Sequence, residues 1–192
     1  VGVTAEVDLM CREMKDSAVL GSRTQSGDYR FFVVYWNTYN FVGGLGGQGN
    51  WYFRNFTIAT DTRYLVRSVV KNGTQTLSVN GTQIGSNNKT STFDSEATMA
   101  LFALHFKDGT YHDASKARIY SAKIWVENAT TGTDDLVRDY VPCRDENGVA
   151  CLYDLVSGEY FRNSGSGSFT ASGEIPASVA SSSATVASSI GD

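Results

Sequence analysis

The chain has 192 residues, of which 19% are charged, and its formal net charge is -4. This length allows one domain with a substantial hydrophobic core. The small acidic excess lacks the basic patch that nucleic-acid binding requires, and no apolar run approaches the length that spans a membrane. We therefore expect neither a nucleic-acid partner nor membrane insertion. The chain begins at Val1 rather than at Met, which indicates a piece of a longer or processed protein.

The composition favours β-structure over helix. Tyrosine and phenylalanine each occur 10 times and glycine 19 times, whereas proline occurs twice. Aromatic residues suit the pleated, half-buried surface of a sheet, and no stretch repeats its apolar residues at helical spacing. We therefore expect an all-β domain.

Short strands separated by turn residues follow one another along the chain. Alternating or apolar segments predict strands at residues 4–10, 18–22, 30–36, 51–58, 63–71, 76–79 and 82–84, with another starting at Phe41. The dipeptide Asn80-Gly81 suits the type I′ turn of a hairpin. Residues 98–106 form the most apolar segment and predict a central strand. About a dozen short strands predict a two-sheet antiparallel β-sandwich.

Residues 117–162 carry the clearest succession of strands and turns. A strand at 136–141 is expected to end at Pro142, because proline lacks the N–H that a sheet ladder uses. A turn at 145–148 leads into the last apolar run, at residues 151–156. The alternation at 118–126 predicts one face with Arg118, Tyr120, Ala122, Ile124 and Val126, and another with Ile119, Ser121, Lys123 and Trp125.

The motifs follow in the order VNG hairpin, apolar strand, RIYSAKIW, LVRDYVPC and GVACLYDLVSGEYFRNSGSGSF. This order resembles the concanavalin A-like, laminin-G-like jelly-roll domains of gut bacterial surface proteins and of phage tail or structural proteins. The resemblance spans residues 3–173 and implies a jelly-roll sandwich located extracellularly, on a cell surface or on a virion. Ala150-Cys151 stand where the family often has glycine. The motif residues are core and turn positions, so the resemblance transfers no catalytic role.

The composition changes after Gly173. Residues 174–192 are nearly all small, and such a segment buries too little surface alone to offset the entropy of ordering it. We therefore expect one sandwich domain over residues 1–173 and a Ser/Ala-rich tail or linker over residues 174–192. The tail would pack on a neighbour or lead into another domain, and both alternatives favour a component of an assembly.

The three cysteines, Cys11, Cys143 and Cys151, form no CxxC pair, which argues against a zinc site. Cys143 and Cys151 flank a turn and would face each other across a hairpin. Two alternatives stay open for this pair, a cross-strand disulfide and free buried thiols that act as small apolar residues.

The segment Glu6-Val7-Asp8-Leu9-Met10-Cys11 resembles the E-x-D-x-x-E strand motif of family 16 glycoside hydrolases, which share the sandwich fold. Retaining hydrolysis needs two carboxylates about 5 Å apart, as nucleophile and as acid/base. Cys11 stands where the motif has its second glutamate, and a thiol cannot replace that carboxyl. The two histidines, His105 and His112, lack a nucleophile-elbow context. We therefore expect no enzymatic activity.

Two aromatic segments are candidates for ligand binding. Sugar sites combine an aromatic face with amide or carboxylate hydrogen bonds. The first candidate comprises Trp36, Asn37, Tyr39 and Asn40, and the second Tyr111, His112 and Asp113. The alternative is that the tryptophans fill the core between the sheets.

No cofactor is expected, with one alternative. The loop at 107–113 offers carboxylates and carbonyls that suit a hard cation such as calcium, although its spacing matches no strict loop motif. Otherwise the loop is a simple solvated turn. Five N-x-[ST] sequons, at Asn55, Asn72, Asn80, Asn88 and Asn128, are interpreted as structural, because Asn suits turns.

Two functions therefore remain. The first is a carbohydrate-binding or adhesion module that recognises a glycan or a host cell-surface ligand. The second is a structural or decoration domain of a phage particle or surface assembly, which contacts protein neighbours and has no sugar site.

Overall fold

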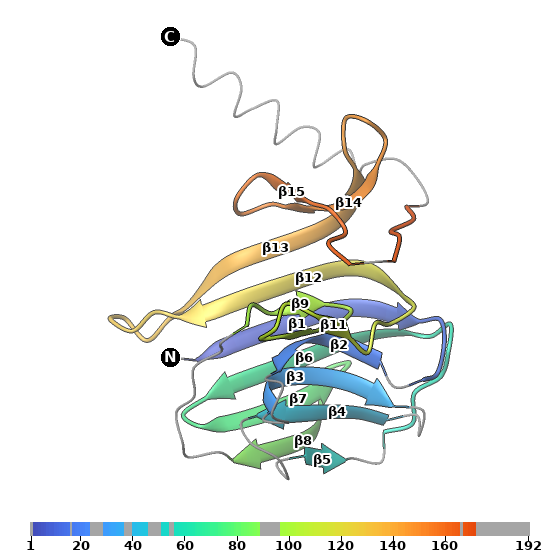
Figure 1. Cartoon of the computed structure of the whole chain (residues 1–192). Helices are drawn as coiled ribbons and strands as arrows, with labels where there is room; N and C mark the ends of the chain where they lie inside the picture. Colours follow the sequence, from blue (N-terminus) through green and yellow to red (C-terminus); the bar gives the residue numbers. More distant parts are fainter. Residues whose placement is uncertain are drawn as a thin grey trace.

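The computed structural model describes residues 2–15, 17–23, 29–36, 40–45, 51–53, 56–88, 97–165 and 167–171. Two β-sheets pack face to face (Figure 1). The larger sheet contains β1 (Val3–Cys11), β6 (Arg63–Lys71), β7 (Thr74–Val79), β8 (Thr82–Asn88), β12 (Ala117–Glu127), β13 (Asp134–Arg144), β14 (Ala150–Asp154) and β15 (Glu159–Phe161). The smaller contains β2 (Ser17–Arg23), β3 (Tyr29–Trp36), β4 (Asn40–Leu45), β5 (Trp51–Phe53), β9 (Ala100–Leu101), β10 (Leu104–Phe106) and β11 (Tyr111–His112).

The strand order confirms the predicted all-β, two-sheet sandwich. The eight strands of the larger sheet follow the order β15-β14-β13-β12-β1-β6-β7-β8. The smaller sheet has the order β11-β10-β2-β3-β4-β5, and β9 also pairs with β2. The expectation of a purely antiparallel arrangement is corrected at one place, because β10 runs parallel to β2. Within the described part of the chain, no helix is long and apolar enough to cross a membrane.

The hydrophobic core follows from the alternation of the strands. In β1, Ala5, Val7 and Leu9 are buried, whereas the residues between them face the other way. Across the core, the Phe41 ring of β4 meets the Tyr64 ring of β6 edge to face, with centroids 5.7 Å apart. Each large apolar side chain buried in this way stabilises the fold by about 1.5–3 kcal/mol. The core therefore lies between β1, β6 and β7 on one side and the smaller sheet on the other.

The larger sheet continues beyond the smaller one. In Figure 1, β13, β14 and β15 rise above the rest, and no strand of the smaller sheet lies in front of them. The end of the core here is closed by Tyr140 and Phe161, whose rings meet edge to face at 5.1 Å. The hairpin between β12 and β13 projects to the left in the same view.

The apolar segment 98–106 is not one central strand, and that prediction is wrong. The segment forms the short strands β9 and β10, which are separated at Phe102 by a backbone φ of 59°. The Phe102 N–H donates to the Val19 carbonyl at 2.9 Å, so a contact with β2 stabilises the break. β9 runs antiparallel to β2 and β10 parallel to it, which places both at one edge of the smaller sheet.

The alternation predicted for β12 holds before Tyr120 and after it, but the assignment of faces changes at Tyr120. Register against β1 shifts there: Asp8 pairs with Ser121 and Leu9 with Ile119, so Tyr120 is the extra residue of a bulge. A bulge reverses which residues face inward. Both Ile119 and Ile124 consequently pack against the core, although the alternation had placed them on opposite faces.

Two strand ends also differ from the predictions. β13 continues through Pro142 to Arg144, because Pro142 lies where β13 pairs with β14 but no longer with β12. The missing N–H therefore costs no hydrogen bond of the ladder. The strand predicted at 51–58 is described as β5 only over Trp51–Phe53, and Ile58 is a buried core residue outside any strand.

The sequon asparagines in the described turns serve the backbone, as expected. Asn80 has a φ of 50° and Gly81 a φ of 80°, as a type I′ turn requires. The Asn80 Oδ1 accepts a hydrogen bond from the Leu65 N–H at 2.9 Å. In the β12–β13 turn, the Asn128 Oδ1 accepts a hydrogen bond from the Thr130 N–H at 2.9 Å.

Candidate functional site

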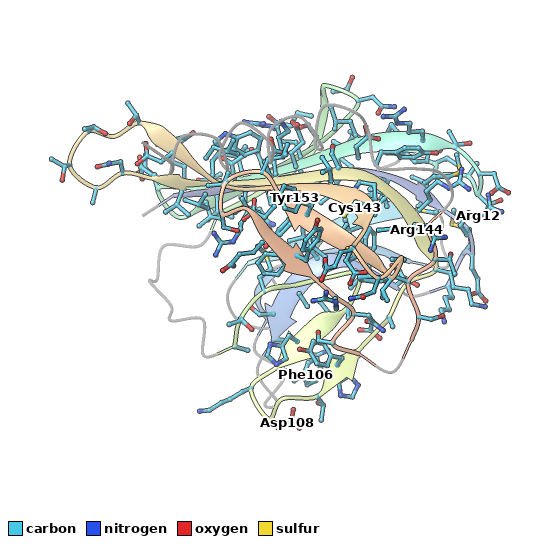
Figure 2. All side chains as sticks on the ribbon, turned by 90° about the horizontal axis from the view of Figure 1, so that it is seen from above. Arg12, Phe106, Asp108, Cys143, Arg144 and Tyr153 are labelled. Carbon is cyan, nitrogen blue, oxygen red and sulfur yellow. The ribbon has the colours of Figure 1, made fainter. Side chains whose placement is uncertain are left out.

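The hairpin of β10 and β11 forms one edge of the smaller sheet. Its turn is closed by the Phe106 N–H, which donates to the Thr110 carbonyl at 2.9 Å, and by the Gly109 N–H, which donates to the Phe106 carbonyl at 2.9 Å. Gly109 adopts a φ of 83°, a conformation that favours glycine. Figure 2 shows Phe106 and Asp108 at this edge, well away from Tyr153, Cys143 and Arg144.

One face of the hairpin carries a stacked pair. His105 and Tyr111 are directly opposite in the register, and their rings stack with centroids 4.7 Å apart and planes at 12°. The His105 Nδ1 lies 2.9 Å from the Thr98 hydroxyl and 3.0 Å from the Thr98 carbonyl oxygen. Because the neighbouring Leu104 is buried, alternation turns His105 and Tyr111 away from the interior. Tyr111 is 40% exposed.

The other face carries a second stacked pair, between Phe106 and His112. Their ring centroids are 4.2 Å apart, and the guanidinium of Arg23 lies over the Phe106 ring, 5.3 Å from its centroid. This packing ties the hairpin to β2.

A hydrogen-bonded chain fixes the His112 ring. The Thr110 hydroxyl donates to the Asp108 Oδ1 at 2.6 Å and therefore accepts from the His112 Nε2, which lies 3.0 Å away. A nucleophilic hydroxyl would instead donate its proton to the imidazole. The arrangement of Asp108, Thr110 and His112 is therefore a structural chain and not a catalytic triad.

The structure brings the second predicted site together only in part. Tyr111 and His112 occupy opposite faces of β11, and the Asp113 carbonyl accepts a hydrogen bond from the Ala18 N–H at 2.7 Å. Tyr111 is instead accompanied by His105, which was not among the candidate residues predicted from the sequence. The turn at residues 107–110 carries the signal for this pair, because a hairpin closed there places His105 opposite Tyr111.

The first predicted site falls largely outside the described residues. Asn37 and Tyr39 are not described, and of Trp36 and Asn40 the structure gives the backbone pairing that closes the β3–β4 hairpin. The side chains of Trp36 and Asn40 lie outside the part of the chain that the structure describes. The proposed role of these residues in binding therefore stays a prediction.

The acidic loop of the hairpin has the geometry of an ordinary turn. The Asp108 Oδ1 accepts hydrogen bonds from both the N–H and the hydroxyl of Thr110, at 2.9 and 2.6 Å. This is the side-chain-to-backbone pattern by which Asp stabilises turns. Over the residues that the structure describes, no three His, Cys, Asp or Glu side chains gather as a metal site would require.

The glycosidase-like segment of β1 forms ion pairs on the outer face of the larger sheet. The Asp8 carboxylate accepts hydrogen bonds from the Arg63 Nε and NH2 at 2.7 and 2.5 Å. The Glu6 Oε2 accepts one from the Arg67 NH1 at 3.0 Å. Cys11 is buried in the core on the opposite face. The segment is therefore an ordinary strand alternation whose half-buried carboxylates are each held by an arginine.

The motif residues near the end of the chain stabilise two consecutive hairpins, β13–β14 and β14–β15, which we call the closing hairpins. Asp154 is fully buried, and its Oδ1 accepts hydrogen bonds from the Asp139 and Val156 N–H groups at 2.8 and 3.1 Å. Its Oδ2 accepts one from the Ser157 hydroxyl at 2.9 Å. Burial alone would raise the pKa of Asp154, but these hydrogen bonds and the charge of Arg138 outweigh it and lower the pKa.

Asp145 organises the turn between β13 and β14 in the same way. Its Oδ1 accepts from the Val149 N–H at 2.9 Å and from the Asn147 N–H at 3.0 Å, and Arg162 binds its Oδ2 at 2.6 Å. The hydrogen bond from Val149 and then the Arg162 guanidinium lower the pKa of Asp145, against the opposing effect of desolvation. Both carboxylates therefore serve the scaffold.

No protein-family model matches the chain, and no curated protein matches it in sequence. Among solved structures, it is similar to a "putative carbohydrate binding protein" from Bacteroides ovatus ATCC 8483, with 11% identity and a TM-score of 0.61. That alignment covers 83% of this chain and 50% of the other, so the chain spans half of that protein's length. A second structure is a mutant of Trypanosoma rangeli sialidase displaying trans-sialidase activity, with 14% identity, a TM-score of 0.49, and coverage of 64% and 20%. The first likeness shows a shared β-sandwich fold.

Proposed function

We propose that this chain is a non-catalytic carbohydrate-binding module that contacts its ligand through the outer face of the β10–β11 hairpin. The observation that carries the proposal is the stacked pair of His105 and Tyr111, with rings 4.7 Å apart and Tyr111 40% exposed. His105 covers one face of the tyrosine ring and fixes its plane. An aromatic ring held in place in this way loses little entropy when a sugar stacks on it.

Polar groups beside the ring supply the hydrogen bonds that sugar hydroxyls need. The His105 imidazole stacks on the Tyr111 ring, the Thr98 hydroxyl lies 2.9 Å from the His105 Nδ1, and Tyr111 carries a hydroxyl of its own. Asp113 adds a carboxylate immediately after β11. An aromatic face combined with such groups is the usual composition of a sugar site.

The fold and its likenesses support the same function. The protein from Bacteroides ovatus that shares the fold is named for carbohydrate binding. The motif order over residues 3–173 resembles concanavalin A-like, laminin-G-like domains, which supports an extracellular position on a cell surface or a virion. The ligand would then be a glycan, including one on a host cell surface.

A structural or decoration domain is the second candidate. Exposed apolar side chains flank β14 at both of its ends, with Val149 49% exposed before the strand and Leu155 44% and Val156 46% exposed after it. Apolar side chains displayed at a sheet edge favour contact with protein neighbours in an assembly. A structural domain of this kind should form an oligomer and bind no sugar. Size-exclusion chromatography with light scattering tests the first of these expectations.

The first experiment is a glycan array, run with and without calcium. We expect at least one glycan class to bind reproducibly; failure of every glycan under both conditions would overturn the proposal. A ligand found in this way is then titrated calorimetrically into matched tyrosine variants.

Tyr111→Ala should weaken binding roughly tenfold or more, because a lost aromatic contact of about 1.4 kcal/mol corresponds to that factor. Tyr160→Ala is the matched control, since Tyr160 is 39% exposed and packs on Tyr153 at 5.1 Å in the other sheet. Binding lost in Trp36→Ala but retained in Tyr111→Ala would assign the ligand to the β3–β4 hairpin instead.

A further inference from the structure

Two thiols face each other across the β13–β14 hairpin. Cys143 and Cys151 are directly opposite in the register, and their Sγ atoms are 3.4 Å apart. Both cysteines are free, and they are 4% and 3% exposed. Directly opposite residues of antiparallel strands have Cα atoms about 4.5–5.5 Å apart, which lies within the range that a disulfide spans.

The β13–β14 hairpin holds the two cysteines rigidly opposite each other. The Asp145 N–H donates to the Val149 carbonyl at 2.9 Å, and the Gly148 N–H donates to the Asp145 carbonyl at 2.9 Å. Arg162 then clamps Asp145 from beyond β15, and the Arg144 guanidinium holds the Gly148 carbonyl at 2.6 Å. Closing a bond between the two sulfur atoms would therefore need side-chain rotation and no change in strand register.

The pair lies outside the main hydrophobic core. Tyr140 and Leu152 belong to the core cluster, so alternation places Cys143 and Cys151 on the opposite face of β13 and β14. A bond between the sulfur atoms would leave the packing between the sheets intact. The pair is also distant from the β10–β11 hairpin (Figure 2), so chemistry at the two sulfur atoms is independent of the proposed ligand.

We propose that Cys143 and Cys151 are a reversible modification site, which a low-molecular-weight disulfide such as oxidised glutathione converts into a cross-strand disulfide. One cysteine attacks a sulfur of oxidised glutathione, forming a mixed disulfide and releasing one reduced glutathione. The second cysteine attacks the protein sulfur of that mixed disulfide and releases the second reduced glutathione. The two protein thiols lose two electrons and two protons, and the two glutathione thiols gain them.

Burial makes this exchange slow. Desolvation, followed by the hydrogen bond with the Cys151 thiol, raises the pKa of Cys143 to about 12. Because the thiolate is the attacking form, little of it is present at neutral pH in the closed hairpin. β14 and β15 are the last two strands of the larger sheet, so local opening there exposes the thiols more readily than opening of the centre would. The oxidation rate should therefore increase with pH and with low concentrations of urea.

The test is incubation of the whole chain with oxidised glutathione at pH 8, with and without about 1 M urea, a concentration below the usual unfolding range. We expect the intact mass to fall by about 2 Da, the mass of the two hydrogens removed in the exchange. Trypsin should then release residues 139–144 linked to residues 145–162, since cleavage follows Arg138, Arg144 and Arg162. The melting temperature should rise by roughly 5 °C, because the bond constrains the unfolded chain, and dithiothreitol should reverse both changes.

Single-cysteine variants provide the controls. Cys11→Ala should retain the mass loss, and Cys143→Ala and Cys151→Ala should each abolish it. Three persisting thiols after equilibration in urea, or stable mixed disulfides with glutathione, would overturn the proposal. A disulfide that forms but lowers the melting temperature would also overturn it, because the pair would then be strained in the closed state.

Discussion

The closing hairpins of β13, β14 and β15 and the β10–β11 hairpin are built on different principles. In the closing hairpins, two carboxylates accept backbone N–H groups: Asp154 those of Asp139 and Val156, and Asp145 those of Asn147 and Val149. In the β10–β11 hairpin, stacked rings and hydroxyl contacts hold the side chains, and the ladder pairs two residues of each strand. The first arrangement fixes the backbone, and the second presents side chains.

The closing hairpins therefore serve stability, and the proposed recognition lies in the β10–β11 hairpin. A buried carboxylate that both backbone and side-chain donors already occupy is poorly placed to bind a ligand. A short edge hairpin contributes few core contacts, and its outward rings contact the surrounding solvent. The sequence segment richest in motifs therefore belongs to the scaffold, and the candidate surface belongs to a segment with few motifs. Four predictions test this division.

The largest expected effect is that of Asp154→Asn on stability. The amide can still accept at one atom, but its NH2 group would meet the Ser157 hydroxyl and Arg138, which lie 2.9 and 3.7 Å from Oδ2. Replacing a charged acceptor in a buried network should lower the free energy of unfolding by about 2–3 kcal/mol. Urea denaturation measures this, and the affinity for a glycan proposed to bind the β10–β11 hairpin should not change.

Glu159→Gln is the matched control for that variant. Glu159 is the register partner of Asp154 and is exposed, so the same change of charge should alter the unfolding free energy by less than about 0.5 kcal/mol. Equal effects of the two substitutions would show that net charge, and not the buried hydrogen bonds, determines stability at this end of the sheet.

The second effect is acid sensitivity. Hydrogen bonds from backbone N–H groups lower the pKa values of Asp145 and Asp154 below the ordinary value of 3.8. The unfolded chain therefore binds more protons than the folded chain in this range, and stability falls as the pH drops below about 4 and through the folded-state pKa values. Urea midpoints between pH 2 and 7 measure the fall, which should be shallower in Asp154→Asn. An equally steep fall in the variant would exclude Asp154 as its origin.

Much of the scaffold could be predicted because local chemistry determines it. β6 coincides with the predicted strand at 63–71, and Asn80-Gly81 forms the expected turn, since both depend on alternation and on φ preferences. The break at Phe102 could not be predicted in this way. It depends on the Val19 carbonyl of β2, which is distant in sequence, and an apolar run gives no sign of it. The bulge at Tyr120 likewise depends on register against β1.

The same limit applies to the candidate site. The sequence identified Tyr111 and His112 as loop residues with the chemistry of a sugar site, but it treated His105 and Phe106 as part of a central strand. Their stacking depends on the register that the turn at residues 107–110 sets. Side-chain contacts across a hairpin can therefore be predicted from the sequence only when the ends of its strands are known.

The third prediction compares one glycine from each region. Gly148 and Gly109 have φ values of 74° and 83°, and a Cβ added at either would meet nothing within 4 Å. Alanine should therefore cost backbone strain alone, about 1 kcal/mol for Gly148→Ala. Gly109→Ala should cost less in global unfolding, because an edge hairpin can relax locally. Thermal unfolding of both variants, with Gly167→Ala as the unstrained control, measures the difference; equal losses would indicate equally rigid turns.

The smallest expected effect is that of Thr110→Val. The substitution keeps the shape but removes the hydroxyl that links Asp108 to the His112 Nε2. Exposed hydrogen bonds contribute little, so stability should fall by less than about 0.5–1 kcal/mol. NMR should nevertheless show a changed ring environment for His112 and an unchanged one for His105, because Thr98 and Tyr111 hold His105 independently. A simultaneous change at both histidines would mean that the two faces of the hairpin are coupled, and that its display surface depends on the Asp108 turn.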